Sequence, residues 1–276
     1  MRRKILFILL FIFPFFFGCM PLTEVHNYAA SSVEALNKIN AVNYTFKDYC
    51  HQDCELQQLR LGEIRPAFNC NCEEAASNAD DAIQKIHQTI TTYLEAIAQL
   101  SNNQDFTYDV SGLTQAVKKS ALLQLSDKQL AVSTKAGNFI ATAATVFYRQ
   151  KKLKQYLGEA DSIFQDLTAT FIYLIDNRLR AQLKFEYDTR IPNIKQMADN
   201  TNDKGMKQIF VKLYLDEKAY YNRHNALIDT YAALLKSVQK GYHDLYMHRY
   251  NLKDESFKNL IKHYLQDVQY LASSIK

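Results

Sequence analysis

Four cysteines carry the clearest chemistry in this chain. Cys50 and Cys54 are four positions apart, and Cys70 and Cys72 are two positions apart. Four thiols at these positions could form two disulfides, or they could bind zinc as thiolates with His51 beside them. Zinc sites usually carry cysteine pairs separated by two to four residues, and a Cys-x-Cys pair fits that pattern less well. The spacing therefore favours disulfides, with a metal site or free thiols as the alternatives.

The rise per residue predicts how these cysteines pair. Four helical steps from Cys50 to Cys54 advance about 6 Å, and two extended steps from Cys70 to Cys72 advance about 6.6 Å. If the chain turns near Gly62 and returns extended, the two pairs meet in antiparallel order. The predicted disulfides are Cys54–Cys70 and Cys50–Cys72, each stabilising by roughly 2–4 kcal/mol. Bridges within each pair are the alternative, and they would be strained.

A second group of reactive side chains lies near the C-terminus. It comprises His243, Asp244, Tyr246 and His248, with His224 about five helical turns earlier. His243 and His248 would diverge by about 140° on a straight helix, so they could not easily share one metal ion. An acid/base role near His243 is therefore a minority hypothesis, and surface or interface histidines are the main interpretation.

Glu217 and His224 are seven residues apart, which places them on one helix face but two turns apart. The sequence lacks a phosphate-binding P-loop, a Gly-x-Ser-x-Gly nucleophile elbow, a His-Glu-x-x-His zinc motif and the paired Glu-x-x-His units of di-metal bundles. We therefore predict no catalytic residue, no cofactor and no metal site.

The N-terminus has the pattern of a secretory signal peptide. The basic residues Arg2–Lys4 precede an apolar block, Ile5–Phe17, and the small residue Gly18 follows it. This block has 13 residues, fewer than the roughly 17–25 that span a bilayer, and Pro14 interrupts it. We expect residues 1–18 to be removed. An ordinary signal peptide cut nearby and an uncleaved anchor are the alternatives.

The pair Gly18-Cys19 resembles the lipobox of bacterial lipoproteins. The resemblance covers only about twenty residues, and Phe16 and Phe17 depart from the usual leucine and small residue. It implies cleavage before Cys19, acylation of Cys19 with palmitate-like chains, and attachment to a lipid bilayer. Because Met20 rather than aspartate follows, it also implies an outer-membrane anchor that faces the periplasm.

Composition limits the classes of partner. The formal charge is +4, and Arg2–Lys4 supply three of these charges, so the mature chain carries about +1. A nearly neutral chain lacks the concentrated basic surface that nucleic acid requires, and we expect no nucleic-acid partner. The low counts of Gly (7) and Pro (4) favour helix, and the 18 tyrosines suit helix interfaces.

Apolar residues recur at helical spacing through most of the mature chain, and no strand pattern is present. The helices that we expect cover residues 23–61, 72–100, 111–125, a stretch that starts at 126, 163–183 and beyond, 206–250 and 255–271. Pro192 is expected to end or kink the fifth of these, the segment 200–205 to break the chain, and Gly241 to offer a possible bend.

Local signals mark several helix ends. Gly62 is expected to terminate the first helix, Ser111 to cap the third and Asp254 to cap the last. Ser126 and Gln129 have the spacing of a capping box. The small residues of 136–147 predict a tightly packed buried helix, with membrane insertion as the alternative.

These patterns predict an all-α fold, an elongated antiparallel bundle of about six or seven helices with an N-terminal disulfide-stapled hairpin. The expected organisation is a signal peptide (1–18), a lipidated tether (19–23), the stapled hairpin (24–101) and a long-helix bundle (111–276), the last two possibly forming one domain. The function expected is that of a membrane-anchored periplasmic binding, scaffold or accessory protein with an unknown protein partner. A membrane-active, pore-forming-like protein is the alternative, and an envelope enzyme with a cleft near His243 is the third choice.

Overall fold

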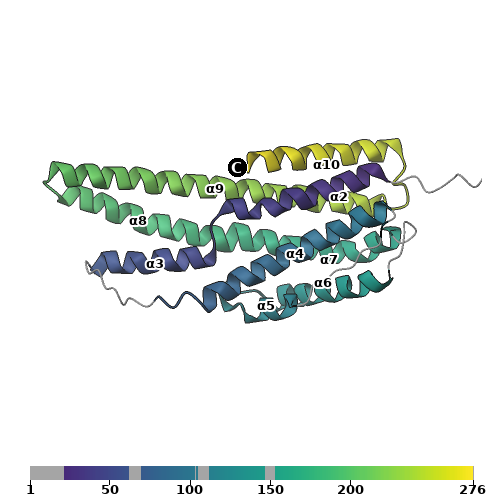
Figure 1. Cartoon of the computed structure of the whole chain (residues 1–276), viewed down its shortest axis with the longest axis horizontal. Coiled ribbons are helices and arrows are strands. Elements are labelled where there is room, and N and C mark those ends of the chain that lie inside the picture. Colours follow the sequence, from purple (N-terminus) through teal and green to yellow (C-terminus); the bar gives the residue numbers. More distant parts are fainter. Residues whose placement is uncertain (1–21, 62–69, 103, 105–111, 147–152, 276) are drawn as a thin grey trace, which may run out of the picture.

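The computed structural model describes residues 22–61, 70–102, 104, 112–146 and 153–275. Within these ranges the chain is helical and contains no strand. The helices form an elongated bundle whose long axis follows α9 (Figure 1). The elements in chain order are α2 (Thr23–Leu36), η2 (Asn37–Val42), α3 (Phe46–Leu61), α4 (Ala75–Ser101), α5 (Leu113–Lys119), η3 (Ala121–Leu123), α6 (Asp127–Val146), α7 (Leu153–Tyr173), η5 (Leu174–Leu179), α8 (Arg180–Asn200), α9 (Lys204–Met247) and α10 (Glu255–Ser274). The predicted fold class is confirmed.

One long hairpin organises the bundle. The π-helix η5 joins α7 to α8 without a break, so one helical run extends from Leu153 to Asn200. The chain then reverses at 201–203 and returns as α9, which confirms the predicted break. The α8–α9 turn forms one end of the molecule, and α2 begins toward the other end (Figure 1). Of the two outcomes expected at Pro192, a helix end or a kink, the end is excluded, because α8 continues through Pro192 to Asn200.

The core is continuous from α2 to α10. Tyrosines contribute much of it: Tyr28, Tyr93, Tyr156, Tyr231 and Tyr242 are among the largest fully buried side chains. Four of the five hydroxyls donate to backbone carbonyls, as when Tyr28 donates to the Val238 carbonyl at 2.7 Å and Tyr231 to the Leu36 carbonyl at 3.1 Å. The Tyr242 hydroxyl has no hydrogen-bond partner in the described part of the chain. Each bond satisfies a polar atom that would otherwise be costly to bury.

The prediction of one helix over 23–61 is wrong. The α-helix ends at Leu36, continues as the 3-10 helix η2 and breaks at Asn43, whose φ of 46° lies in the left-handed region. Asparagine tolerates that region better than most residues. The apolar periodicity that suggested a single helix therefore belongs to two helices joined by a bend.

The start of α3 is fixed by a capping box that the sequence analysis missed. The Asp48 backbone N–H donates to Thr45 Oγ1 at 3.0 Å, and the Thr45 N–H donates to Asp48 Oδ2 at 2.9 Å. From α4, Asp80 accepts the N–H groups of Phe46 and Lys47 at 2.9 and 3.1 Å. These bonds satisfy donors that have no partner within the helix.

Thr45→Ala is expected to lower the free energy of unfolding by about 1 kcal/mol, because it removes the capping hydroxyl. Thr230→Ala is the matched control, since Thr230 lies inside α9, where its hydroxyl donates to the Ala226 carbonyl one turn earlier and alanine is the better helix former. Urea unfolding followed by circular dichroism measures both. Equal stabilities for the two variants would contradict the capping role.

The disulfides pair as predicted. Cys50 bonds Cys72 and Cys54 bonds Cys70, with Cα–Cα distances of 5.6 and 6.0 Å. They attach α3 to the segment that leads into α4, so a stapled hairpin is present. The expected turn at Gly62 lies outside the described residues.

The other predictions of helix ends are confirmed only in part. Ser126 and Gln129 do form a capping box, in which the Ser126 N–H donates to Gln129 Oε1 at 2.9 Å. The third helix is shorter than expected: α5 spans Leu113–Lys119, a short 3-10 turn follows, and Ser111 lies outside the described residues. Asp254 precedes α10, but its side chain makes no capping bond.

The small-residue segment 136–147 lies in α6 up to Val146, and Phe147 lies outside the described residues. There Ala136 and Ile140 are buried in the core. No helix within the described ranges is both long and apolar enough to span a membrane.

Candidate functional site

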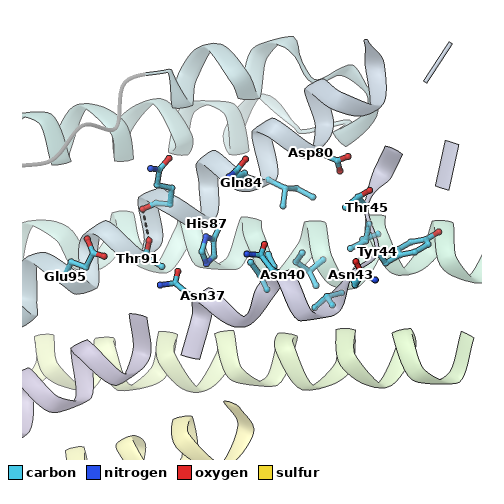
Figure 2. Close-up of a pocket in the computed structure, with 16 residues that line it drawn as sticks. Asn37, Asn40, Asn43, Tyr44, Thr45, Asp80, Gln84, His87, Thr91 and Glu95 are labelled. Atoms are coloured by element: carbon cyan, nitrogen blue, oxygen red, sulfur yellow. Dashed lines mark hydrogen bonds between the residues drawn. The ribbon is translucent and has the colours of Figure 1, made fainter. Parts of the chain in front are cut away.

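A polar groove of about 770 Å³ lies between η2 and α4. We define the polar groove by the residues that line it: Asn37, Ile39, Asn40, Val42, Asn43, Tyr44, Thr45, Asp80, Ile83, Gln84, His87, Gln88, Thr91, Glu95, Ile175 and Leu179. Figure 2 shows α4 along one side and the η2 segment along the other. The π-helix η5 contributes the apolar residues Ile175 and Leu179. Single π turns of this kind are frequent at functional sites.

On the η2 side, three asparagines follow one another at intervals of three. A 3-10 helix has three residues per turn, so side chains at i and i+3 are aligned. Asn37, Asn40 and the adjoining Asn43 therefore form a row along the groove, and all three are exposed. The 3-10 geometry thus places side-chain amides that are three positions apart in one row.

On the α4 side, the polar residues recur at helical spacing. Asp80, Gln84, His87, Thr91 and Glu95 are separated by three or four positions, which places them on one face of α4. From Asp80 to Glu95 this face extends about 22 Å. Figure 2 shows the five side chains in sequence order along the helix. The groove is thus long enough for an extended ligand.

Several of these side chains have unused hydrogen-bonding capacity. Within the described ranges, the side chains of Asn37, Asn40, Asn43, Gln84 and Glu95 have no hydrogen-bond partner. Each amide can donate two hydrogen bonds and accept more, and the carboxylate accepts only. No lysine or arginine is among the described lining residues. The groove therefore suits an uncharged ligand that both donates and accepts.

Two titratable residues in the groove have defined roles. His87 Nε2 lies 3.1 Å from the Leu36 carbonyl, so this nitrogen carries the proton. Burial lowers the pKa of His87, which leaves its Nδ1 as an acceptor. Burial raises the pKa of Asp80, although its bonds to the α3 backbone oppose that shift. Asp80 thus holds α3 in place and is not free for a ligand.

Tyr44 connects the polar groove to a buried cluster of charged residues. This Glu186 cluster comprises Tyr44, Gln52, Glu186, Arg190 and Glu217. Glu186 is only 4% exposed and accepts a hydrogen bond of 3.1 Å from the Tyr44 hydroxyl. Arg190 lies 3.6 Å from Glu186 but only 2.8 Å from Glu217. Burial raises the pKa of Glu186 to about 7, with Glu217 adding to the shift and Arg190 opposing it.

The Gln52 amide completes this cluster. Its nitrogen is placed toward the Glu186 carboxylate, and its oxygen accepts the Tyr220 hydroxyl at 3.0 Å. The reverse orientation would put the amide oxygen against the carboxylate, which is repulsive. Since Gln52 lies on α3, the cluster joins the stapled helix to α8 and α9.

The residues around His243 are not gathered into one site. His243 Nδ1 lies 3.1 Å from Oδ2 of Asp161 on α7, a residue that the sequence analysis did not select. Asp244 accepts the Tyr264 hydroxyl at 2.6 Å, and the ring of His248 stacks on Phe257. Tyr246 stays near His243, with ring centres 5.8 Å apart.

Burial raises the pKa of Asp161, although His243 opposes that shift. The acid/base hypothesis at His243 therefore has one carboxylate partner, Asp161. It remains a prediction.

Glu217 belongs to the Glu186 cluster and His224 borders it, and within the described ranges no hydrogen bond or ion pair joins their two side chains. Glu217 pairs with Arg190, and the ring of His224 lies near those of Tyr220 and Tyr44, with centres 4.0 and 6.0 Å away. His224 Nδ1 donates to the Tyr220 carbonyl at 2.9 Å. Among the described residues, no group of three or more histidines, cysteines or acidic residues could hold a metal ion.

The predicted lipidation site, Cys19, lies outside the described residues. The polar groove was not predicted, although the sequence contained a signal for its η2 side. Three asparagines occur at Asn37, Asn40 and Asn43. Asparagine favours turns over helix interiors, so this spacing could have indicated a 3-10 segment. The α4 side carried no comparable signal, because polar residues at helical spacing are typical of any solvated face.

Comparisons with protein families, with curated proteins and with solved structures found no match to this chain.

Proposed function

We propose that this chain is a lipid-anchored binding protein of the bacterial cell envelope, without catalysis of its own, that holds an extended uncharged ligand in the polar groove. The location is supported by the signal-like segment before Cys19 and by two disulfides, which suit an oxidising compartment. Cys19 precedes the start of α2 by four positions in the sequence, and the α8–α9 turn lies at the other end of the molecule from the start of α2 (Figure 1).

One observation carries the choice of ligand: two opposed rows of polar side chains, of which five have no partner within the described part of the chain. A ligand rich in hydroxyl and amide groups satisfies such rows, because it can donate and accept along its length. Glu95 disfavours an anion, and the groove offers no described cation to offset it. A linear neutral oligosaccharide has this chemistry and can be as long as the groove.

Calorimetric titration of the purified chain with linear neutral oligosaccharides tests the proposal. Asn40→Trp is expected to reduce the affinity at least tenfold (about 1.4 kcal/mol), because the indole fills the groove opposite Gln84. Asn138→Trp is the matched control, since Asn138 is exposed on α6 and does not line the groove. It should leave the affinity unchanged.

The same saccharides bearing carboxylates should bind more weakly. Tighter binding of the carboxylated chains, or equal effects of the two tryptophan variants, would contradict the proposal. Absence of binding by every saccharide would likewise remove it.

A further inference from the structure

A second cavity, of about 510 Å³, lies between α3, α8 and α9. Its walls are largely apolar, and the apolar residues are Leu56, Ile194, Met197, Phe210 and Leu213. Sites for small molecules in proteins are typically clefts of about 300–1,000 Å³ with apolar walls and a few polar groups. The cavity shares no lining residue with the polar groove. We call it the distal cavity.

The apolar surface continues beyond the distal cavity along α9. Met206 and Ile209 are 43% and 58% exposed, and Leu213, which lines the cavity, is 41% exposed. Large apolar side chains that remain in water on one stretch of helix mark a surface that a ligand or partner covers. This stretch favours an occupant with an aliphatic part.

Two charged residues, Arg190 and Glu217, line the distal cavity. The Arg190 guanidinium has three carboxylates within 4 Å: Glu217 at 2.8 Å, Glu186 at 3.6 Å and Glu55 at 3.7 Å. One positive charge is therefore shared among more acidic groups than it can neutralise, even when Glu186 is protonated. An additional anion would be repelled there, whereas a cation would be attracted.

We propose that the distal cavity binds a small aliphatic molecule that carries one positive charge. The alkyl chain of this molecule lies against Phe210 and Leu213, and its positively charged group pairs with Glu217. The apolar walls provide affinity for the chain, and the excess of carboxylates selects the charge of the head group. This binding does not depend on the function proposed for the polar groove.

Octylammonium, octanol and octanoate form a matched series of probes, because they share one alkyl chain and differ in head-group charge. Calorimetric titration of the purified chain should show octylammonium binding about tenfold more tightly than octanol, with octanoate weaker than both. Equal affinities for the three probes, or the tightest binding for octanoate, would overturn the proposal.

Two variants locate the site. Glu217→Gln should bring the affinity for octylammonium down to that for octanol and leave the affinity for octanol unchanged. Leu213→Trp should fill the distal cavity and weaken both probes at least tenfold. The natural chain has no tryptophan, so the introduced indole also reports binding by fluorescence.

Leu215→Trp is the control for this second variant. Leu215 is 57% exposed on α9 but does not line the cavity, so binding should persist. If Leu213→Trp and Leu215→Trp behave alike, the probes bind elsewhere and the proposal fails.

Discussion

Glu186→Gln is expected to stabilise the protein by about 3 kcal/mol at pH 8 and to have little effect near pH 4. The Glu186 carboxyl is almost fully buried, and Arg190, its nearest cation, lies closer to Glu217. Burial accordingly raises its pKa to about 7. Glutamine keeps the shape of the side chain and removes the charge. The Tyr44 hydroxyl can rotate to accept from the new amide.

The direction of the pH dependence follows from linkage between proton binding and folding. An acid whose pKa is higher in the folded protein binds its proton more tightly there, so its contribution to stability is complete below the unfolded value of about 4.5. This contribution is lost as the pH rises through about 7. Stability of the natural chain should therefore fall between pH 5 and 8 through this group, and the variant should lack that component.

Urea unfolding of both proteins across this pH range measures the difference. Glu55→Gln is the matched control, because Glu55 also lies near Arg190 but is 69% exposed. The control should keep the pH dependence of the natural chain. A Glu186→Gln variant that is less stable than the natural chain at pH 8 would contradict this expectation. It would show that the hydrogen bonds and Arg190 stabilise the charged carboxylate by more than burial destabilises it.

The sequence predicted those features that depend on neighbouring residues. The pairing of Cys50 with Cys72 and of Cys54 with Cys70 followed from the rise per residue within two short segments. The Ser126 capping box is equally local, and so is the break before Lys204. For the capping box and the break, the physical cause lies within a few positions of the residues concerned. The disulfides join residues 22 and 16 positions apart, so their prediction also required that the chain reverse between the two cysteine pairs.

Features that depend on distant residues were not predictable. Tyr44 and Glu186 are 142 positions apart, and Arg190 and Glu217 are 27 apart. Nothing in the sequence near Glu186 indicates that it is buried, since a glutamate on a helix is normally solvated. The polar groove was not predictable for the same reason, because the polar face of α4 becomes one side of a groove only when η2 packs opposite it.

The error at 23–61 has a different origin. Apolar residues on the two sides of Asn43 happen to keep the spacing of one helix, so periodicity alone could not detect the bend. The capping pair Thr45 and Asp48 would have indicated a new start, because a threonine followed three residues later by an acidic residue is a helix N-terminal signal. Capping signals should therefore outweigh continuity of the apolar pattern.

At Gly241, helix propensity alone predicts the wrong sign for the change in stability that an alanine substitution causes. The sequence offered a possible bend there, and α9 is one helix that runs through Gly241 to Met247. A Cβ atom at Gly241 would lie 2.7 and 2.9 Å from ring atoms Cζ and Cε2 of Tyr28. Tyr28 is fully buried and is held by its hydrogen bond to Val238. The glycine therefore permits α2 to approach α9 closely.

Gly241→Ala is accordingly expected to destabilise the protein by about 3 kcal/mol. Helix propensity alone would favour alanine by about 1 kcal/mol, but overpacking and a displaced Tyr28 hydroxyl each cost about 1–3 kcal/mol. Gly158→Ala on α7 is the matched control, because its new Cβ would meet only Arg249 at 3.7 Å, an ordinary contact. The control should gain stability, by up to about 1 kcal/mol.

Thermal and urea unfolding distinguish these signs, and a second substitution tests the cause. If the Tyr28 ring is the obstacle, then Tyr28→Leu combined with Gly241→Ala should be less destabilised than the sum of the single variants. Strict additivity would mean that the loss at Gly241 arises without contact with Tyr28. A gain in stability for Gly241→Ala would mean that α2 and α9 can separate at little cost, which the bond from Tyr28 to the α9 backbone argues against.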